Sequence, residues 1–69
     1  MGLRHLESIS EFLENRKDWV TRTEVRDCLG FNYVTVVESL NFLWEHGDVD
    51  MKEENGRVFF RWRDPVIRG

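Results

Sequence analysis

Cysteine, proline and long apolar runs are scarce in this 69-residue sequence. Cys28 is the only cysteine, so no internal disulfide can form, and this fits a reducing, cytoplasmic location. Cys28 and the two histidines, His5 and His46, do not have a recognisable zinc-binding spacing. We therefore expect Cys28 to be a small buried apolar residue on a short helix.

No apolar run approaches the roughly 18 residues that indicate a membrane span. The first residues, MGLRHLES, lack the apolar core of a signal peptide. Leu6 stands where an N-myristoylation motif needs Ser or Thr. The single proline, Pro65, lies near the end, and there is no repeat, linker or low-complexity tract. The sequence predicts one domain over residues 1–69, with no membrane partner.

Groups that could carry catalysis or hold a metal are also missing. We recognise no nucleophile–base pair, carboxylate pair, phosphate loop or set of metal ligands. A chain of about 60 residues buries only roughly 60% of its unfolded surface, which leaves little room for a deep catalytic cleft. We expect neither an enzyme nor a bound cofactor. The chain is 41% hydrophobic and 13% aromatic, which favours an ordered fold over a disordered tail.

Positive charge is scarce overall and unevenly distributed. The formal net charge is −3 and the pI is about 5.3, whereas nucleic-acid binders are usually basic. From Glu38 to Glu54 six acidic residues accompany one basic residue, Lys52, a local charge of −5. From Arg57 to Gly69 four arginines accompany one acidic residue, a local charge of +3. The sequence predicts a dipolar molecule with a basic C-terminal strand.

Apolar spacing and capping residues predict three helices. Apolar residues at helical spacing indicate an amphipathic helix over residues 3–16, followed by a short extended piece, DWVT. Thr21 and Glu24 can form a capping box for a second helix, whose apolar stripe is Val25, Cys28 and Leu29 and which stops at Gly30. Asn32 is a good N-cap for a third helix over residues 33–46, which ends at Gly47 and carries an apolar stripe of Val36, Leu40 and Leu43.

The last part of the sequence predicts a β-hairpin. The pair Asn55-Gly56 between two extended runs is a strong hairpin signal. Alternation puts Val58, Phe60 and Trp62 on one face of the second strand, and Arg57, Phe59, Arg61 and Arg63 on the other. We expect Phe60 and Trp62 to fill the core.

This order of elements resembles the winged helix-turn-helix family. The matching residues in the helix-turn-helix part are Thr21, Glu24, Val25, Leu29, Gly30, Asn32, Thr35, Val36, Leu40, Leu43, Gly47 and Val49. The wing matches through ENGRVFFRW, and the resemblance covers nearly the whole chain. It implies an α+β winged helix of the small prokaryotic or archaeal type: three helices, a short strand and a C-terminal two-stranded wing.

The resemblance also implies double-stranded DNA as a partner and a role in transcription regulation. In DNA-binding members the third helix enters the major groove, while the second helix and the wing contact phosphates. The base-facing positions it implies here are Val34, Thr35, Val37, Glu38 and Asn41. The phosphate-contact positions it implies are Arg22, Thr23, Asn32, Tyr33 and Arg57.

Features of the third helix also favour an alternative, a protein-interaction module without DNA affinity. This helix has no Lys or Arg, and Glu38 stands where similar DNA binders often carry Arg. Arg22 and Arg26 could equally form surface ion pairs, and the acidic residues across the hairpin would weaken Arg57 as a phosphate ligand. The large aromatic residues of the chain are either part of the core or part of a surface that binds a second copy or another protein. The residues we consider for that surface are Phe12, Trp19, Phe42 and Trp44.

Overall fold

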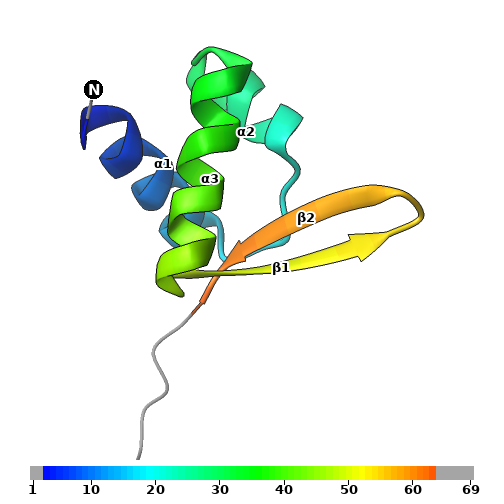
Figure 1. Cartoon of the computed structure of the whole chain (residues 1–69). Coiled ribbons are helices and arrows are strands. Elements are labelled where there is room, and N and C mark those ends of the chain that lie inside the picture. The colour runs from blue at the N-terminus through cyan, green and yellow to red at the C-terminus, as the bar shows by residue number, and fades with distance from the viewer. Residues whose placement is uncertain (1–2, 64–69) are drawn as a thin grey trace, which may run out of the picture.

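Three helices pack around one another and a two-stranded hairpin closes one side of them (Figure 1). The computed structural model describes residues 3–63, with side chains from His5 onward. Its elements are α1 (Leu3–Arg16), α2 (Arg22–Leu29), α3 (Tyr33–His46), β1 (Val49–Glu54) and β2 (Arg57–Trp62). The fold is an α+β winged helix, as the sequence predicted. Pro65 and the last of the four arginines between Arg57 and Gly69 lie outside the described residues.

Local capping explains why the helices begin and end where predicted. The Thr21 hydroxyl accepts from the backbone N–H of Glu24 at 3.1 Å, and the Glu24 carboxylate accepts from the backbone N–H of Thr21 at 3.1 Å. The side-chain oxygen of Asn32 accepts from the N–H of Val34 at 2.9 Å, which starts α3. The glycine after α3, Gly47, has φ of 86°, a left-handed conformation that residues with a Cβ adopt only with strain.

The capping box predicts a measurable loss of stability on substitution. Thr21→Ala leaves the N–H of Glu24 without its hydroxyl acceptor, and we expect the free energy of unfolding to fall by about 1 kcal/mol. Urea denaturation followed by circular dichroism measures this difference. Thr23→Ala is the matched control, because Thr23 is exposed in the same helical turn and does not cap it. Equal losses for both variants would contradict the role given to the cap.

The hairpin has the register that its turn requires. Asn55 and Gly56 both have positive φ, 53° and 78°, as a two-residue type I′ turn demands. Antiparallel pairing joins Glu54 to Arg57 next to the turn and ends at Val49 and Trp62. Val20 precedes Thr21, the N-cap of α2, and forms a short antiparallel bridge with β2 on the edge that does not pair with β1. Val20 and Phe60 exchange two backbone hydrogen bonds of 2.8 Å there.

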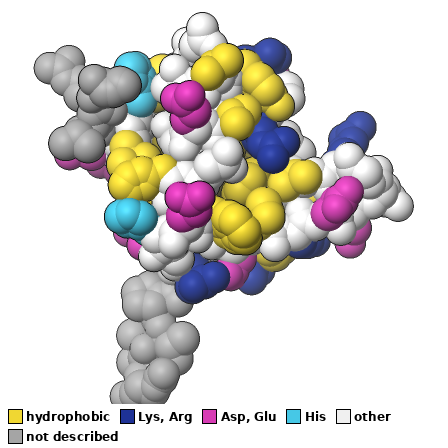
Figure 2. All heavy atoms as spheres, in the orientation of Figure 1, with side chains coloured by type: hydrophobic (Ala, Val, Ile, Leu, Met, Phe, Trp, Pro, Cys, Tyr) yellow, Lys and Arg dark blue, Asp and Glu magenta, His cyan; other side chains and the backbone are white. Residues whose placement is uncertain are grey.

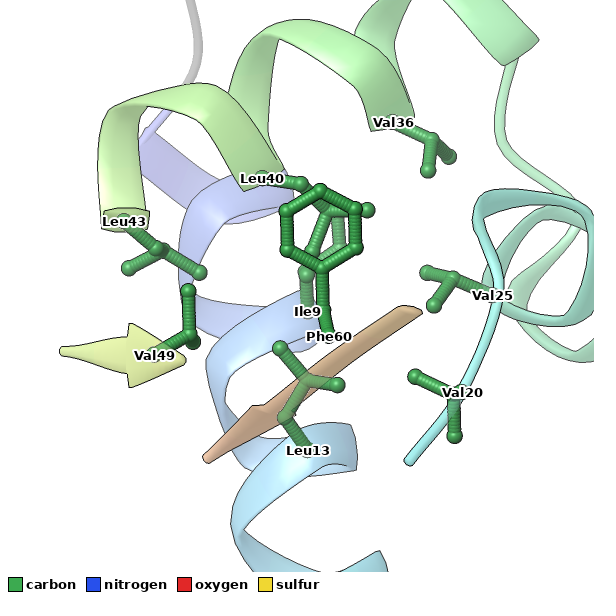
Figure 3. Packing of buried hydrophobic residues seen from close by; sticks show 9 residues of the cluster. All are labelled: Ile9, Leu13, Val20, Val25, Val36, Leu40, Leu43, Val49 and Phe60. Carbon is green, nitrogen blue, oxygen red and sulfur yellow. The ribbon is translucent and has the colours of Figure 1, made fainter. Parts of the chain in front are cut away.

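The core draws side chains from every element (Figure 3). Phe60 lies with its ring among residues from α1, α3 and β1, and is fully buried, as predicted. The buried cluster consists of Ile9, Leu13, Val20, Val25, Val36, Leu40, Leu43, Val49 and Phe60. Trp62 packs against this cluster but is only half-buried, so the prediction that it fills the core holds only in part. It is the last residue of β2.

The prediction that Cys28 is buried was wrong. The thiol is exposed, while Val25 is fully buried and Leu29 packs partly against the core. The helix α2 has only eight residues and faces the core through the i, i+4 pair Val25 and Leu29. Cys28 is therefore rotated to the flank of the helix, outside its narrow buried stripe.

Candidate nucleic-acid interface

An open cleft of about 500 Å³ lies between the first turn of α2, the start of α3 and the tip of the wing. Its lining residues come from the first turn of α2, the start of α3 and the wing, which extends outward from the foot of the helices (Figure 1). Four residues that the resemblance implied as phosphate contacts line it: Arg22, Thr23, Tyr33 and Arg57. The other lining residues are Thr21, Gly56 and Val58. Residues far apart in the sequence thus form one polar site.

The two arginines of this cleft have no carboxylate partner among the residues that the structure describes. Within residues 5–63, neither Arg22 nor Arg57 forms an ion pair. The Arg22 guanidinium lies 5.6 Å from the centroid of the Phe60 ring, and its buried Nε has no hydrogen-bond partner among the described residues. Five other cations of the described chain are paired: Arg16 with Glu24, Arg26 with Asp27, Lys52 with Glu54, and both Arg61 and Arg63 with Asp50. The cleft therefore offers two guanidinium groups to an external anion.

Two charged residues near the cleft bear on the sequence-based expectations: Glu54 does not pair with Arg57, whereas Arg26 forms the surface ion pair considered for it. Glu54 is the cross-strand neighbour of Arg57, yet its carboxylate pairs with Lys52 at 3.5 Å and leaves Arg57 without an ion pair. Arg26 pairs with Asp27 at 3.0 Å, and its guanidinium lies 5.9 Å from the centroid of the Tyr33 ring. The unpaired positive charge at the cleft is therefore that of Arg22 and Arg57, because Asp27 neutralises Arg26.

The start of α2 adds polar groups to the cleft. The first backbone N–H groups of an α-helix have no partner within the helix, and its N-terminus attracts anions. The Thr21 hydroxyl already accepts from Glu24, while the exposed Thr23 has its own hydroxyl available beside the cleft. Asn32 does not line this cleft, and its side-chain oxygen is occupied by the cap of α3.

The outward strip of α3 carries the positions implied to face bases. Val34 is 60% exposed, and Glu38 and Asn41 are exposed on the same strip. Thr35 and Val37 are half-buried on its flanks. An Asn amide can pair with an adenine edge, and a Glu carboxylate can accept from the cytosine amine.

The surface between α3 and the wing is apolar. Figure 2 shows hydrophobic side chains gathered there, with acidic side chains on α3 beside them. Among the described residues, the large exposed hydrophobic ones are Tyr33, Val34, Phe42 and Trp44 on α3 and Met51 on β1; of these, Phe42 lies on the side of α3 that faces α1. Sequence reasoning did not identify Met51, because its side of β1 could not be known before the register placed it opposite Phe60.

The aromatic residues proposed as a partner surface divide into two kinds. Phe42 and Trp44 are exposed, at 38% and 45%. Phe12 and Trp19 are half-buried. The guanidinium of Arg16 lies 5.4 Å from the centroid of the Phe12 ring. The ammonium of Lys52 and the guanidinium of Arg61 lie 4.6 and 4.5 Å from the centroid of the Trp19 ring. Of the four, only Phe42 and Trp44 are therefore exposed.

The part of the chain that the structure describes has neither a metal site nor a membrane-spanning helix. It contains no group of three or more His, Cys, Asp or Glu side chains placed to hold a metal ion. Between residues 3 and 63, none of the helices combines the length and apolar character needed to cross a bilayer.

Comparisons with known proteins support the fold. A solved structure from work on the DNA-recognition and protein-interaction domains of HOP2 superposes with a TM-score of 0.79. The match covers 86% of this chain and 98% of that chain, at 17% sequence identity. No family model and no curated protein matches the sequence. The similarity to this structure is one of fold, and it agrees with the winged helix described above.

Proposed function

We propose that this chain binds double-stranded DNA, with α3 in the major groove and the cleft on the phosphate backbone. The observation that carries the proposal is that Arg22 and Arg57, which lack carboxylate partners among the described residues, line one cleft beside α3. A guanidinium binds phosphate oxygens through charge-assisted hydrogen bonds. The HOP2 structure with the same fold comes from work on DNA-recognition and protein-interaction domains, which supports a nucleic-acid or protein partner here.

In this arrangement the two groups of residues have different tasks. Phosphate contacts fix the position of a protein on the duplex, and base contacts select the sequence. Phosphate contacts come from Arg22, Thr23, Asn32, Tyr33 and Arg57. The base-facing residues are Val34, Thr35, Val37, Glu38 and Asn41. The carboxylate of Glu38 repels phosphates, so it limits the orientations in which α3 can dock and the base pairs that α3 can contact. We further propose that the chain is a cytoplasmic transcription regulator of the prokaryotic or archaeal type that acts as a homodimer.

Salt dependence tests DNA binding. We expect a fluorescent duplex of mixed sequence to bind at low salt, and the affinity to fall as salt rises. Two arginine–phosphate contacts give a slope of log K against log salt of about −2, and further contacts make it steeper. Fluorescence anisotropy measures the affinity at each salt concentration. The absence of binding at low salt would overturn the proposal.

The apolar surface between α3 and the wing favours a second candidate, a protein-interaction module. Exposed Trp and Met side chains with polar residues around them are typical of the centre of a protein interface. Trp44 and Met51 have this character, and Glu45 is exposed next to Trp44. Sedimentation analysis tests the self-associating form of this candidate: we expect a concentration-dependent dimer that Trp44→Ser weakens. A monomer at all concentrations would rule that form out.

A further inference from the structure

A second groove, of about 640 Å³, lies between α1 and the C-terminal half of α3. It shares no lining residue with the cleft that contains Arg22 and Arg57. Its lining residues are Leu6, Glu7, Ser8, Ser10, Glu11, Glu14, Phe42, Leu43, His46 and Asp48. We call it the acidic groove.

The edge of the acidic groove is negatively charged. Glu7, Glu11 and Glu14 follow one another along α1 at i, i+4 and i+7, and Asp48 lies beyond the end of α3. All four are exposed, and within residues 5–63 none of them forms an ion pair. No Lys or Arg is among the lining residues. Carboxylates held close together without a cation attract positive charge from outside the chain.

The floor of the acidic groove is apolar. Leu43 is buried and Leu6 packs partly against the core. Phe42 is 38% exposed, and its ring centroid lies 4.1 Å from that of His46 in a tilted stack. Exposed apolar surface bordered by carboxylates is complementary to a ligand that has both cationic and apolar groups. Such a surface suits a polypeptide better than a small hydrated cation.

We propose that the acidic groove binds an amphipathic helix of a protein partner, with apolar side chains on the floor and Lys or Arg side chains against the carboxylates. Glu7 and Glu14 on α1 are seven residue steps apart, or about 10 Å at 1.5 Å per residue. Two turns of a second helix cover this length and present cations at the same i, i+4, i+7 spacing. Apolar residues on the neighbouring stripe of that helix then meet the exposed Phe42 and the partly buried Leu6, as in other helix-in-groove complexes.

This partner site is compatible with the proposed DNA site but does not depend on it. The cleft with Arg22 and Arg57 lies between α2, α3 and the wing, whereas the acidic groove lies between α1 and α3. A bound helix would therefore leave the cationic cleft open. The chain could link a basic helical segment to a duplex, and failure of DNA binding would leave the helix site unaffected.

The test uses a synthetic helical peptide of Leu and Lys, labelled with fluorescein, and measures its anisotropy with the full chain. The Leu residues repeat at i, i+3, i+4 and i+7, and the Lys residues flank them. Two control peptides keep this pattern, one with Glu in place of Lys and one with Ala in place of Leu. We expect the Leu–Lys peptide to bind and both controls to bind at least about tenfold more weakly, because each lacks one half of the required chemistry.

Two charge-reversal variants locate the binding site. We expect Glu11→Lys to weaken the Leu–Lys peptide by about tenfold or more, because a like charge in an interface is strongly unfavourable. Glu53→Lys makes the same change in net charge on the exposed part of the wing, outside the groove, and should change the affinity less than about twofold. Circular dichroism confirms that both variants are folded.

Several results would overturn the proposal. Equal weakening by Glu11→Lys and Glu53→Lys would show diffuse attraction to an acidic protein. Equal binding of the Ala–Lys peptide would show that the floor with Phe42 plays no part. Absence of peptide binding, or a dimer of this chain that Glu11→Lys abolishes, would show that the groove has no partner helix or is filled by a second copy.

Discussion

Phe60→Ala is expected to lower the free energy of unfolding by about 3–5 kcal/mol, the usual loss when a buried phenylalanine is truncated. The Phe60 ring is fully buried among side chains from several elements, so its removal leaves a cavity in the middle of the core (Figure 3). Native domains are stable by only about 5–15 kcal/mol, and one of this size is near the lower end. We therefore expect the variant to be largely unfolded at 37 °C.

Urea denaturation followed by circular dichroism measures this loss, and Phe59→Ala is the matched control. Phe59 is the preceding residue of the same strand and points to the opposite face of the hairpin. It is half-buried, and the ammonium of Lys52 lies 5.6 Å from the centroid of its ring. We expect a much smaller loss for this variant. Similar losses for the two variants would contradict the position of Phe60 at the centre of the core.

Arg57→Gln is expected to weaken duplex binding more than any other single removal of charge on the wing. Arg57 is exposed, lines the cleft and has no ion-pair partner among the described residues, so its whole charge is available to a phosphate. Loss of one phosphate contact reduces the salt slope by about 0.9. We expect a loss of about tenfold in affinity at low salt, equivalent to about 1.4 kcal/mol.

Arg61→Gln is the control for this prediction. It makes the same change in charge on the same face of β2, four residues from Arg57. Arg61 lies outside the cleft, where its guanidinium stacks on Trp19 at 4.5 Å and pairs with Asp50 at 3.9 Å. Fluorescence anisotropy over a range of salt concentrations should show a changed slope for Arg57→Gln and an unchanged slope for Arg61→Gln. Identical slopes for both variants would place the duplex elsewhere.

The sequence was sufficient to predict the fold because the signals that define its elements are local. Thr21 with Glu24 starts one helix, Asn32 starts the next, and Asn55-Gly56 fixes the hairpin register. Each of these signals depends on residues within a few positions of one another, so it can be recognised before any tertiary contact is known. The alternation along β2 then identifies Phe60 as a core residue.

The ion pairing and exposure of individual surface side chains could not be predicted, because both depend on residues that are close only in the folded structure. Arg22 and Arg26 both have acidic residues nearby in the sequence, yet among the described residues only Arg26 forms an ion pair, with Asp27. Cys28 belongs to the apolar positions of α2, but the way α2 packs leaves it exposed. The acidic groove likewise appears only when α1 and the end of α3 are placed side by side.

The backbone exchange between Val20 and Phe60 has a consequence for synthesis on the ribosome. It joins the connection between α1 and α2 to the last strand of the domain. A nascent chain that ends before β2 can form its helices, but the backbone groups of Val20 still face water and the centre of the core is empty. Small domains generally fold as units, and a lone helical segment of this length is only marginally stable. We therefore expect the described fold to become stable in one late step, when β2 has left the exit tunnel.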